Sequence, residues 1–157
     1  MKNKNIAAVV NDLSPSQKSF YLIDTFNKFI DDVNISPSVF QSRSCNPVIQ
    51  PLFSCRLTAS LSSYSGVVIS TTLADAELTL RASNHTNKYL YIWDLSWIYN
   101  TINFSKAMKV LRNDDLTIIA RSESHAEVIE NFCNKKPVAI LEDWQPNKLL
   151  NIVRTNK

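Results

Sequence analysis

Short, continuous apolar runs recur along this chain, and stretches with helical periodicity separate them. The runs cover residues 6–10, 67–70, 89–93, 116–120 and 138–141. Each run is too short for a helix and apolar at nearly every position. Strands in a sheet covered on both faces have this pattern, because neither side of such a strand meets water. The runs therefore predict the strands of one mostly parallel sheet.

A helix is expected directly after the first run. Ser14 is placed to cap it, Pro15 to occupy its first position, and Gln17 to complete a capping box. Apolar residues then recur every three or four positions as far as Val33, so one stripe of this helix faces the core.

The same capping signal predicts later helices, after Thr72 and after Ser122, and residues 147–153 are expected to form a closing helix. Strands that alternate with helices imply right-handed crossovers. We therefore predict an α/β fold: a single Rossmann-like domain over residues 1–157. Its mostly parallel sheet would have five to six strands, with helices on both faces.

Residues 34–65 depart from this alternation, because they contain three prolines and many serines. Within them, residues 39–42 are a candidate second strand. Residues 53–61 are compatible with a strand or with a short helix.

Composition excludes several classes of function. A single glycine, Gly66, cannot supply the glycine-rich phosphate loops of dinucleotide enzymes or P-loop proteins, and no cofactor is expected. The formal net charge of +3 comes from scattered residues, which argues against a dedicated nucleic-acid binder. No apolar run approaches the ~18 residues of a membrane span, and no signal-peptide core is evident. A cytoplasmic location is expected, with reduced thiols at Cys45, Cys55 and Cys133.

Parallel strands place their carboxyl ends on one edge of a sheet. Ligands of α/β proteins bind there, because helix N-termini point free N–H groups outward at that edge. We therefore expect binding residues directly after each strand. In chain order the candidates are Asn11, Asp12, Ser14, Ser70, Thr71, Thr72, Asp94, Ser96, Trp97, Arg121, Ser122, His125, Glu142, Asp143 and Trp144.

The titratable candidates each allow two interpretations. The Asp94 carboxylate can act as a general base or hold a sugar hydroxyl, or it can cap the turn after its strand. His125 falls in the first turn of a helix, where the dipole disfavours a charged imidazole; it is a neutral ligand group or an idle surface residue. Arg121 can pair with an anionic ligand, or with Glu142 or Asp143 on the neighbouring strand end.

Glu142 and Asp143 can hold a ribose diol or a metal, but no third ligand is evident, so no metal site is predicted. A solvated acidic loop is the alternative. Trp93 is expected in the core, whereas Trp97 and Trp144 are expected in loops, as stacking surfaces for a sugar or base or as ordinary packing. The basic residues of one short helix, which either meet phosphates or form a solvated face, are Lys106, Lys109 and Arg112.

The last third of the chain resembles a known family. Residues 116–133 and 137–144 are similar to the end of the N-terminal domain of GT-B glycosyltransferases, where an apolar strand, a serine-capped helix and a further strand lead to the interdomain cleft. Residues 66–73 and 89–95 are similar to the preceding strands of that domain. The likeness covers about residues 60–145. It implies a glycosyltransferase-like domain that binds a sugar or nucleotide-sugar at the strand ends.

If this domain is catalytic, we expect Asp94 to act as the base. Arg121, Ser122 and His125 would then contact an anionic or hydroxylated group of the ligand.

The chain also departs from that family. Residues 11–15 contain no glycine where the family has a glycine-rich loop, the second Rossmann-like domain is absent, and Glu142-Asp143 replaces the usual Asn-Gly. One domain alone would lack most donor contacts, so catalysis implies a second subunit. The alternative is a non-catalytic interaction protein, such as a small phage or mobile-element factor that binds a host protein in the host cytoplasm. The small size and the Asn-, Lys- and Ile-rich composition fit that origin.

Overall fold

The computed structural model describes residues 4–155. The strands are β1 (Lys4–Val10), β2 (Ile35–Gln41), β3 (Ser54–Leu57), β4 (Val67–Ser70), β5 (Asn87–Ile92), β6 (Thr117–Ala120) and β7 (Ala139–Ile140). The α-helices are α1 (Gln17–Phe29), α2 (Leu73–Arg81), α3 (Phe104–Leu111), α4 (Glu123–Cys133) and α5 (Pro146–Thr155). Short 3₁₀ turns are η1 (Thr58–Ser63), η2 (Ser96–Tyr99), η3 (Thr101–Asn103) and η4 (Glu142–Trp144).

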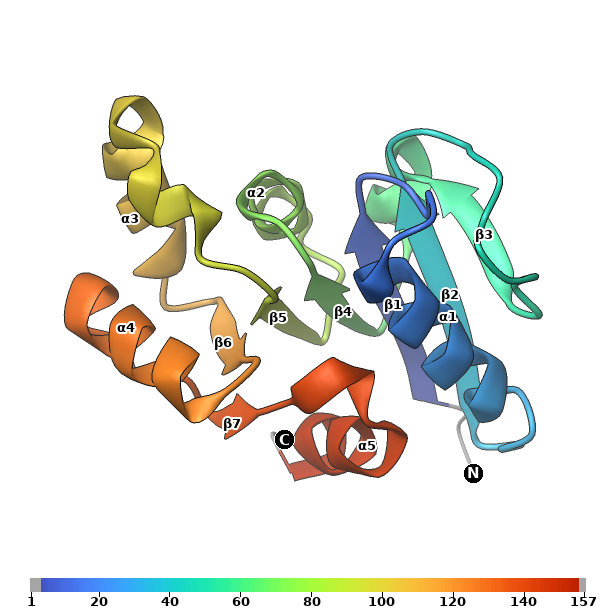
Figure 1. Cartoon of the computed structure of the whole chain (residues 1–157). Helices are drawn as coiled ribbons and strands as arrows, with labels where there is room; N and C mark the ends of the chain where they lie inside the picture. Colours follow the sequence, from blue (N-terminus) through green and yellow to red (C-terminus); the bar gives the residue numbers. More distant parts are fainter. Residues whose placement is uncertain (1–3, 156–157) are drawn as a thin grey trace.

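All seven strands lie in one sheet in the order β3-β2-β1-β4-β5-β6-β7, and every neighbouring pair is parallel (Figure 1). The α/β fold expected from the apolar runs is confirmed. The first six positions follow the strand order of a doubly wound Rossmann-type sheet, and β7 extends it. The chain starts at β1 inside the sheet, continues outward to β2 and β3, and then returns to form β4 on the other side of β1.

Helices cover both faces of the sheet. On one face, α1 and α5 pack over alternate residues of β1, β4, β5 and β6. On the other face, α2, α3 and α4 cover β5 and β6, and the segment around η1 covers β1, β2 and β4. The continuous apolar runs are explained by this double coverage: residues 6–9 are all 0% exposed.

The sheet has more strands than expected, because residues 34–65 contribute two. β2 is longer than the candidate strand at residues 39–42 and includes Pro37, which breaks the sequence pattern. Pro37 pairs with Ile6 of β1, but β3 joins β2 only from Ser38 onward. A proline is tolerated there because β2 has a neighbour on one side only, so a missing N–H donor need not leave a gap in the ladder.

Two of the predicted helix caps are confirmed and one is wrong. The hydroxyl of Thr72 accepts from the backbone N–H of Asp75 at 3.1 Å and caps α2. Ser122 caps α4 in the same way. Helix α1, however, begins at Gln17 and is capped by Ser16, whose hydroxyl accepts from the backbone N–H of Ser19 at 3.1 Å. Ser14 precedes the helix, in a turn where its backbone N–H is bonded to the Asp12 carboxylate.

The single glycine is required by its backbone and its surroundings. Gly66 immediately precedes β4 with φ +154°, and a Cβ built there would lie 2.6 Å from the carbonyl oxygen of Asn5. This conformation and this close approach to β1 both exclude a side chain.

The indole of Trp144 does not occupy its expected place, and that of Trp93 does so only in part. Trp144 is 0% exposed, in the core between the rings of Phe26 and Tyr91, instead of lying at the rim. Asp143 and Trp144 both take left-handed backbone angles (φ 45° and 57°), which turns the Trp144 side chain back under the sheet. Trp93 lies just beyond the end of β5 and is partly buried: it packs against the core beside Tyr91 and also lines the rim.

The thiols, the helix compositions and the basic residues of α3 complete the description of the fold. Cys45, Cys55 and Cys133 are free thiols, of which Cys133 is fully buried. None of the helices within residues 4–155 has the length and apolar composition that a membrane span requires. Two of the three basic residues on and after α3 have protein partners: Lys106 pairs with Glu77 at 2.9 Å, and Arg112 donates to the carbonyl of Cys133 at 3.1 Å.

Candidate functional site

The rim formed by the carboxyl ends of β1, β4 and β5 has the geometry of a binding edge. β1 and β4 are neighbours in the sheet, yet α1 and α2, which follow them, lie on opposite faces. This divergence of connections opens a crevice at the strand ends, where ligands of α/β proteins bind. Three adjoining hollows lie along this rim.

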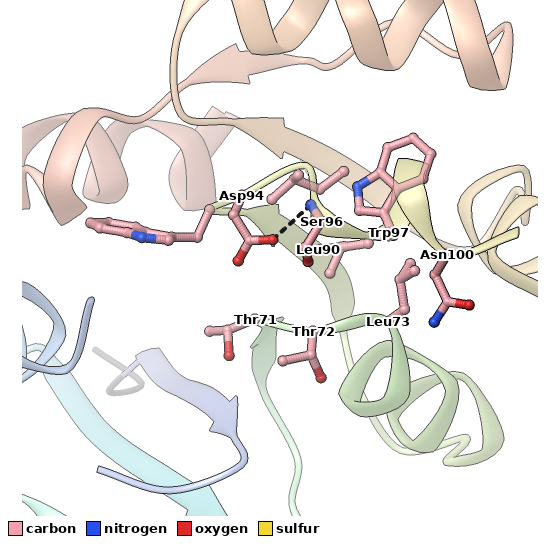
Figure 2. A pocket seen from close by; sticks show the side chains of 10 residues that line it. Thr71, Thr72, Leu73, Leu90, Asp94, Ser96, Trp97 and Asn100 are labelled. Carbon is pink, nitrogen blue, oxygen red and sulfur yellow. Dashed lines mark hydrogen bonds between the residues drawn. The ribbon is translucent and has the colours of Figure 1, made fainter. Parts of the chain in front are cut away.

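The central hollow has a volume of about 370 Å³. Thr71 and Thr72 at the end of β4 form one side, and Asp94 after β5 stands across from them (Figure 2). Trp97 and Asn100, from the η2 segment, close the end of the hollow above α2. The structure thus brings together five residues that were expected at the rim on sequence grounds: Thr71, Thr72, Asp94, Ser96 and Trp97.

The Asp94 carboxylate stabilises the turn after β5 and remains accessible to a ligand. Its Oδ1 accepts a 3.0 Å hydrogen bond from the backbone N–H of Ser96, and the side chain is exposed. Burial raises the pKa of the Asp94 carboxyl, but the hydrogen bonds from Ser96 and the electrostatic effects of Lys18 and His125 outweigh it, so the pKa lies below its ordinary value. Asp94 is therefore ionised at neutral pH, a good hydrogen-bond acceptor and a weak base.

The threonines opposite Asp94 are fixed by the start of α2. Thr72 donates its hydroxyl hydrogen to Asp75 Oδ2 at 2.7 Å while capping the helix, and Thr71 donates to the carbonyl of Val9 at 3.2 Å. Asp75 is 3% exposed, and burial raises its pKa even though Thr72, Lys18 and Thr71 act in the opposite direction. These hydroxyls keep oxygen lone pairs that can accept from a ligand.

Trp97 forms a wall between the central hollow and a second one. The hollow between α2 and α3, about 250 Å³, shares Leu73, Trp97 and Asn100 with the central hollow. The Trp97 ring packs edge-on against Phe132, and its Nε1 is inaccessible to solvent and has no hydrogen-bond partner. The indole is thus held by packing alone.

A third hollow lies on the α1 side of the rim. It has a volume of about 360 Å³, shares Trp93 and Asp94 with the central hollow, and includes Asn11, Ser14 and Lys18. Asn11 donates to Asp12 at 2.9 Å, so part of its hydrogen-bonding capacity is used in the turn. The Ser14 side chain is exposed.

The candidate Ser70 does not reach the rim: it is fully buried, with its hydroxyl 2.8 Å from that of Thr79. The candidates that follow β6 and β7 gather, except for the buried Trp144, in a separate hollow beyond Trp93. It has a volume of about 350 Å³ and contains Arg121, Ser122, His125 and Glu142, but not Asp94. Of the two interpretations of Arg121, the ion pair is observed: Arg121 Nη2 lies 3.0 Å from Asp143 Oδ1.

Packing restricts Arg121 and His125 further. The Arg121 guanidinium stacks 3.9 Å over the Trp93 ring. The backbone N–H of His125 is bonded to the capping Ser122 hydroxyl at 3.2 Å, whereas its Nδ1 is inaccessible to solvent and unpartnered. The structure therefore divides the predicted site into an Asp94 group and an Arg121 group.

Two residues at the rim were not singled out for a ligand role from the sequence. Lys18 is charged and lies within electrostatic reach of both Asp75 and Asp94. Asp75, in the first turn of α2, is the buried partner of the Thr72 hydroxyl. Apolar residues at intervals of three or four positions identify α1 as a helix, but no local sequence signal places its first turn near the end of β5. Within residues 4–155, no group of three or more His, Cys, Asp or Glu side chains is placed to hold a metal ion.

No protein-family model, curated protein or solved structure matches this chain. The likeness of residues 60–145 to glycosyltransferases therefore stays a prediction, and the functional argument rests on the chemistry of the rim.

Proposed function

We propose that this chain is a glycosyltransferase-like domain that binds a sugar or nucleotide-sugar at the carboxyl edge of its sheet, in the central hollow. The observation that carries the proposal is the ionised Asp94 carboxylate standing across from two threonine hydroxyls beside the indole of Trp97. A sugar ring presents hydroxyls at its edge and C–H groups on its faces. A carboxylate accepts strongly from hydroxyl donors, and an indole covers an apolar face.

Binding, and not proton abstraction, is the role that this environment favours for Asp94. A general base works best when its pKa lies near the working pH, whereas the pKa of Asp94 is lowered. If the domain transfers a sugar, the donor contacts and a second reacting group must come from outside this domain. The single domain then supplies one wall of the site.

The proposal is tested on a glycan array and by calorimetric titration with UDP-glucose and GDP-mannose, using the native chain and Asp94→Asn. The asparagine keeps an oxygen for the Ser96 N–H but loses the charge, so we expect the affinity to fall about tenfold or more, equivalent to about 1.4 kcal/mol. Arg56→Gln, which changes a charge on the distant β3, is the matched control and should bind as the native chain does. Absence of binding to every glycan and nucleotide-sugar would overturn the proposal.

The exposed side chains beside the site favour a second candidate function, that of an interaction protein without catalysis. Tyr99 and Ile102 are 85% and 92% exposed, on neighbouring turns that lead from the rim to α3. Exposed apolar side chains next to a groove are common at protein interfaces. Sedimentation velocity tests the case in which the partner is a second copy: the native chain should dimerise, and a Tyr99→Ser/Ile102→Ser variant should remain a monomer.

A further inference from the structure

The three hollows of the rim form one continuous series. The α1 hollow and the central hollow meet at Trp93 and Asp94, and the central hollow meets the α2–α3 hollow at Leu73, Trp97 and Asn100. Asp94 and Trp97, which Figure 2 shows on the same side of the central hollow, therefore mark its two junctions. A ligand confined to the central hollow would leave both neighbours unused.

Each hollow combines an indole with polar side chains. The α1 hollow has Trp93 beside Asn11 and Ser14, and the α2–α3 hollow has Trp97 beside Asn100 and Asn103. The chemistry described for the central hollow, an apolar surface next to hydrogen-bonding groups, is thus repeated on both sides of it. A polymer whose repeating unit has one apolar face and a polar edge matches this repetition.

The charges along the series are largely compensated by the protein itself. Asp12 in the α1 hollow pairs with Arg43 at 2.7 Å, and Glu77 in the α2–α3 hollow pairs with Lys106 at 2.9 Å. Lys18, the remaining cation of the α1 hollow, lies within electrostatic range of both Asp75 and Asp94. In the central hollow, a phosphate or carboxylate would stand beside the Asp94 carboxylate and meet no cation among the lining residues, which favours an uncharged ligand there.

From these three observations, we propose that the ligand is an uncharged oligosaccharide of at least three sugar units, with one unit in each hollow. This inference rests on the proposed function and specifies its substrate class. The middle unit contacts Asp94, Thr71 and Thr72. The flanking units lie against Trp93 on the α1 side and against Trp97 on the α2–α3 side.

The test compares chain lengths on a glycan array that carries linear glucose, mannose, galactose and N-acetylglucosamine series of one, two and three units. Calorimetry then measures the best series and UDP-glucose. We expect the affinity to rise about tenfold or more between one and three units, and UDP-glucose to bind more weakly than the neutral trimer. Equal affinity for monomer and trimer, or tighter binding of UDP-glucose, would overturn the inference and leave the proposed function standing. Failure of all sugars and nucleotide-sugars would overturn the proposed function itself.

Filling one hollow with a larger side chain tests the assignment of one sugar unit to each hollow. Ala74→Trp fills the α2–α3 hollow from α2, and Asn103→Trp fills it from the start of α3, so that one variant remains if the other fails to fold. Either substitution should reduce the affinity for the trimer to that for the dimer and leave the monomer unaffected. Leu78→Trp, on α2 but outside all three hollows, is the matched control. A trimer affinity unchanged in both filling variants would contradict the placement.

Discussion

The hydroxyl of Thr25 in α1 donates a 2.6 Å hydrogen bond to the backbone carbonyl of Trp144, 119 residues later in the chain. Both residues are buried, and the bond ties α1 to the left-handed turn that follows β7. Left-handed backbone at residues other than glycine costs on the order of 1–3 kcal/mol each. The turn is retained because the Trp144 ring fills the core and its carbonyl is bonded.

Replacing Thr25 by valine should lower the free energy of unfolding by about 1–3 kcal/mol, because the shape is kept while the buried Trp144 carbonyl loses its donor. Urea denaturation measures the change. Thr86→Val, at an exposed threonine, is the control and should stay within about 0.5 kcal/mol of the native chain. Equal effects of the two substitutions would show that the Thr25 bond does not hold the turn.

Gly66→Ala should also destabilise the fold, by about 1–3 kcal/mol, because its Cβ would overlap the Asn5 carbonyl in a backbone conformation that side chains avoid. The neighbouring Ser65→Ala changes an exposed side chain and should have little effect. Thermal unfolding of the Gly66→Ala and Ser65→Ala variants measures the two changes in stability. An alanine at position 66 as stable as glycine would mean that β1 and β4 separate easily at this end.

Asp75 should make stability depend on pH with an unusual sign. Burial raises its pKa in the folded state above the unfolded value, so the folded protein is penalised at neutral pH and gains stability as the pH falls through the raised pKa. Asp75→Asn, which imitates the protonated acid, should therefore melt at a higher temperature than the native chain at pH 7, and this difference should vanish near about pH 3.

Glu77 on the same helix supplies the opposite control for Asp75. Lys106 and Arg81 lower its pKa, so Glu77→Gln should melt at a lower temperature than the native chain at pH 7. The same direction of change in both variants would contradict the assignment for Asp75.

Asp94→Ala should change the free energy of unfolding by less than about 1 kcal/mol at pH 7, because the carboxylate is exposed and its hydrogen bonds come from one neighbouring residue, Ser96. Its lowered folded pKa contributes stability above the ordinary value and loses it as the pH falls through the lowered value, so the small difference should disappear near about pH 2. Urea denaturation at both pH values measures this. A loss above about 2 kcal/mol would make Asp94 a structural residue.

The parallel sheet could be predicted because its strands are buried on both faces. Such burial produces continuous apolar runs, which can be recognised without knowing what packs against them. Residues 6–9 illustrate it: all four are apolar, and all four are fully buried. β2 could not be delimited in the same way. It begins with Ile35 and includes Pro37, which is acceptable only because of where β3 starts.

The sequence could predict that the site lies at the carboxyl edge of the sheet, but not which of the candidate side chains lie next to one another there. The rule that ligands meet strand ends finds Asp94 and Thr72 because each follows a recognisable strand. The rule does not decide whether Arg121 is free for a ligand or engaged by Asp143 and Trp93, since that depends on the spacing of the strand ends. The prediction that Trp144 lies at the rim was wrong. Asp143 and Trp144 turn the chain back with left-handed backbone angles, which a glycine often marks in a sequence, but neither residue is a glycine.

The position of α5 has a consequence for how the protein is made. Leu149 and Val153 of this helix are buried in the same core as Tyr89 and Tyr91 of β5. A ribosome releases the helix only after the strands that it covers. Helix α1 can cover its part of this face early, but the part over β5 stays uncovered until α5 is made. Bare apolar surface attracts chaperones and promotes aggregation. Slow elongation before the codons of α5 should therefore lower the yield of native protein more than a pause after them.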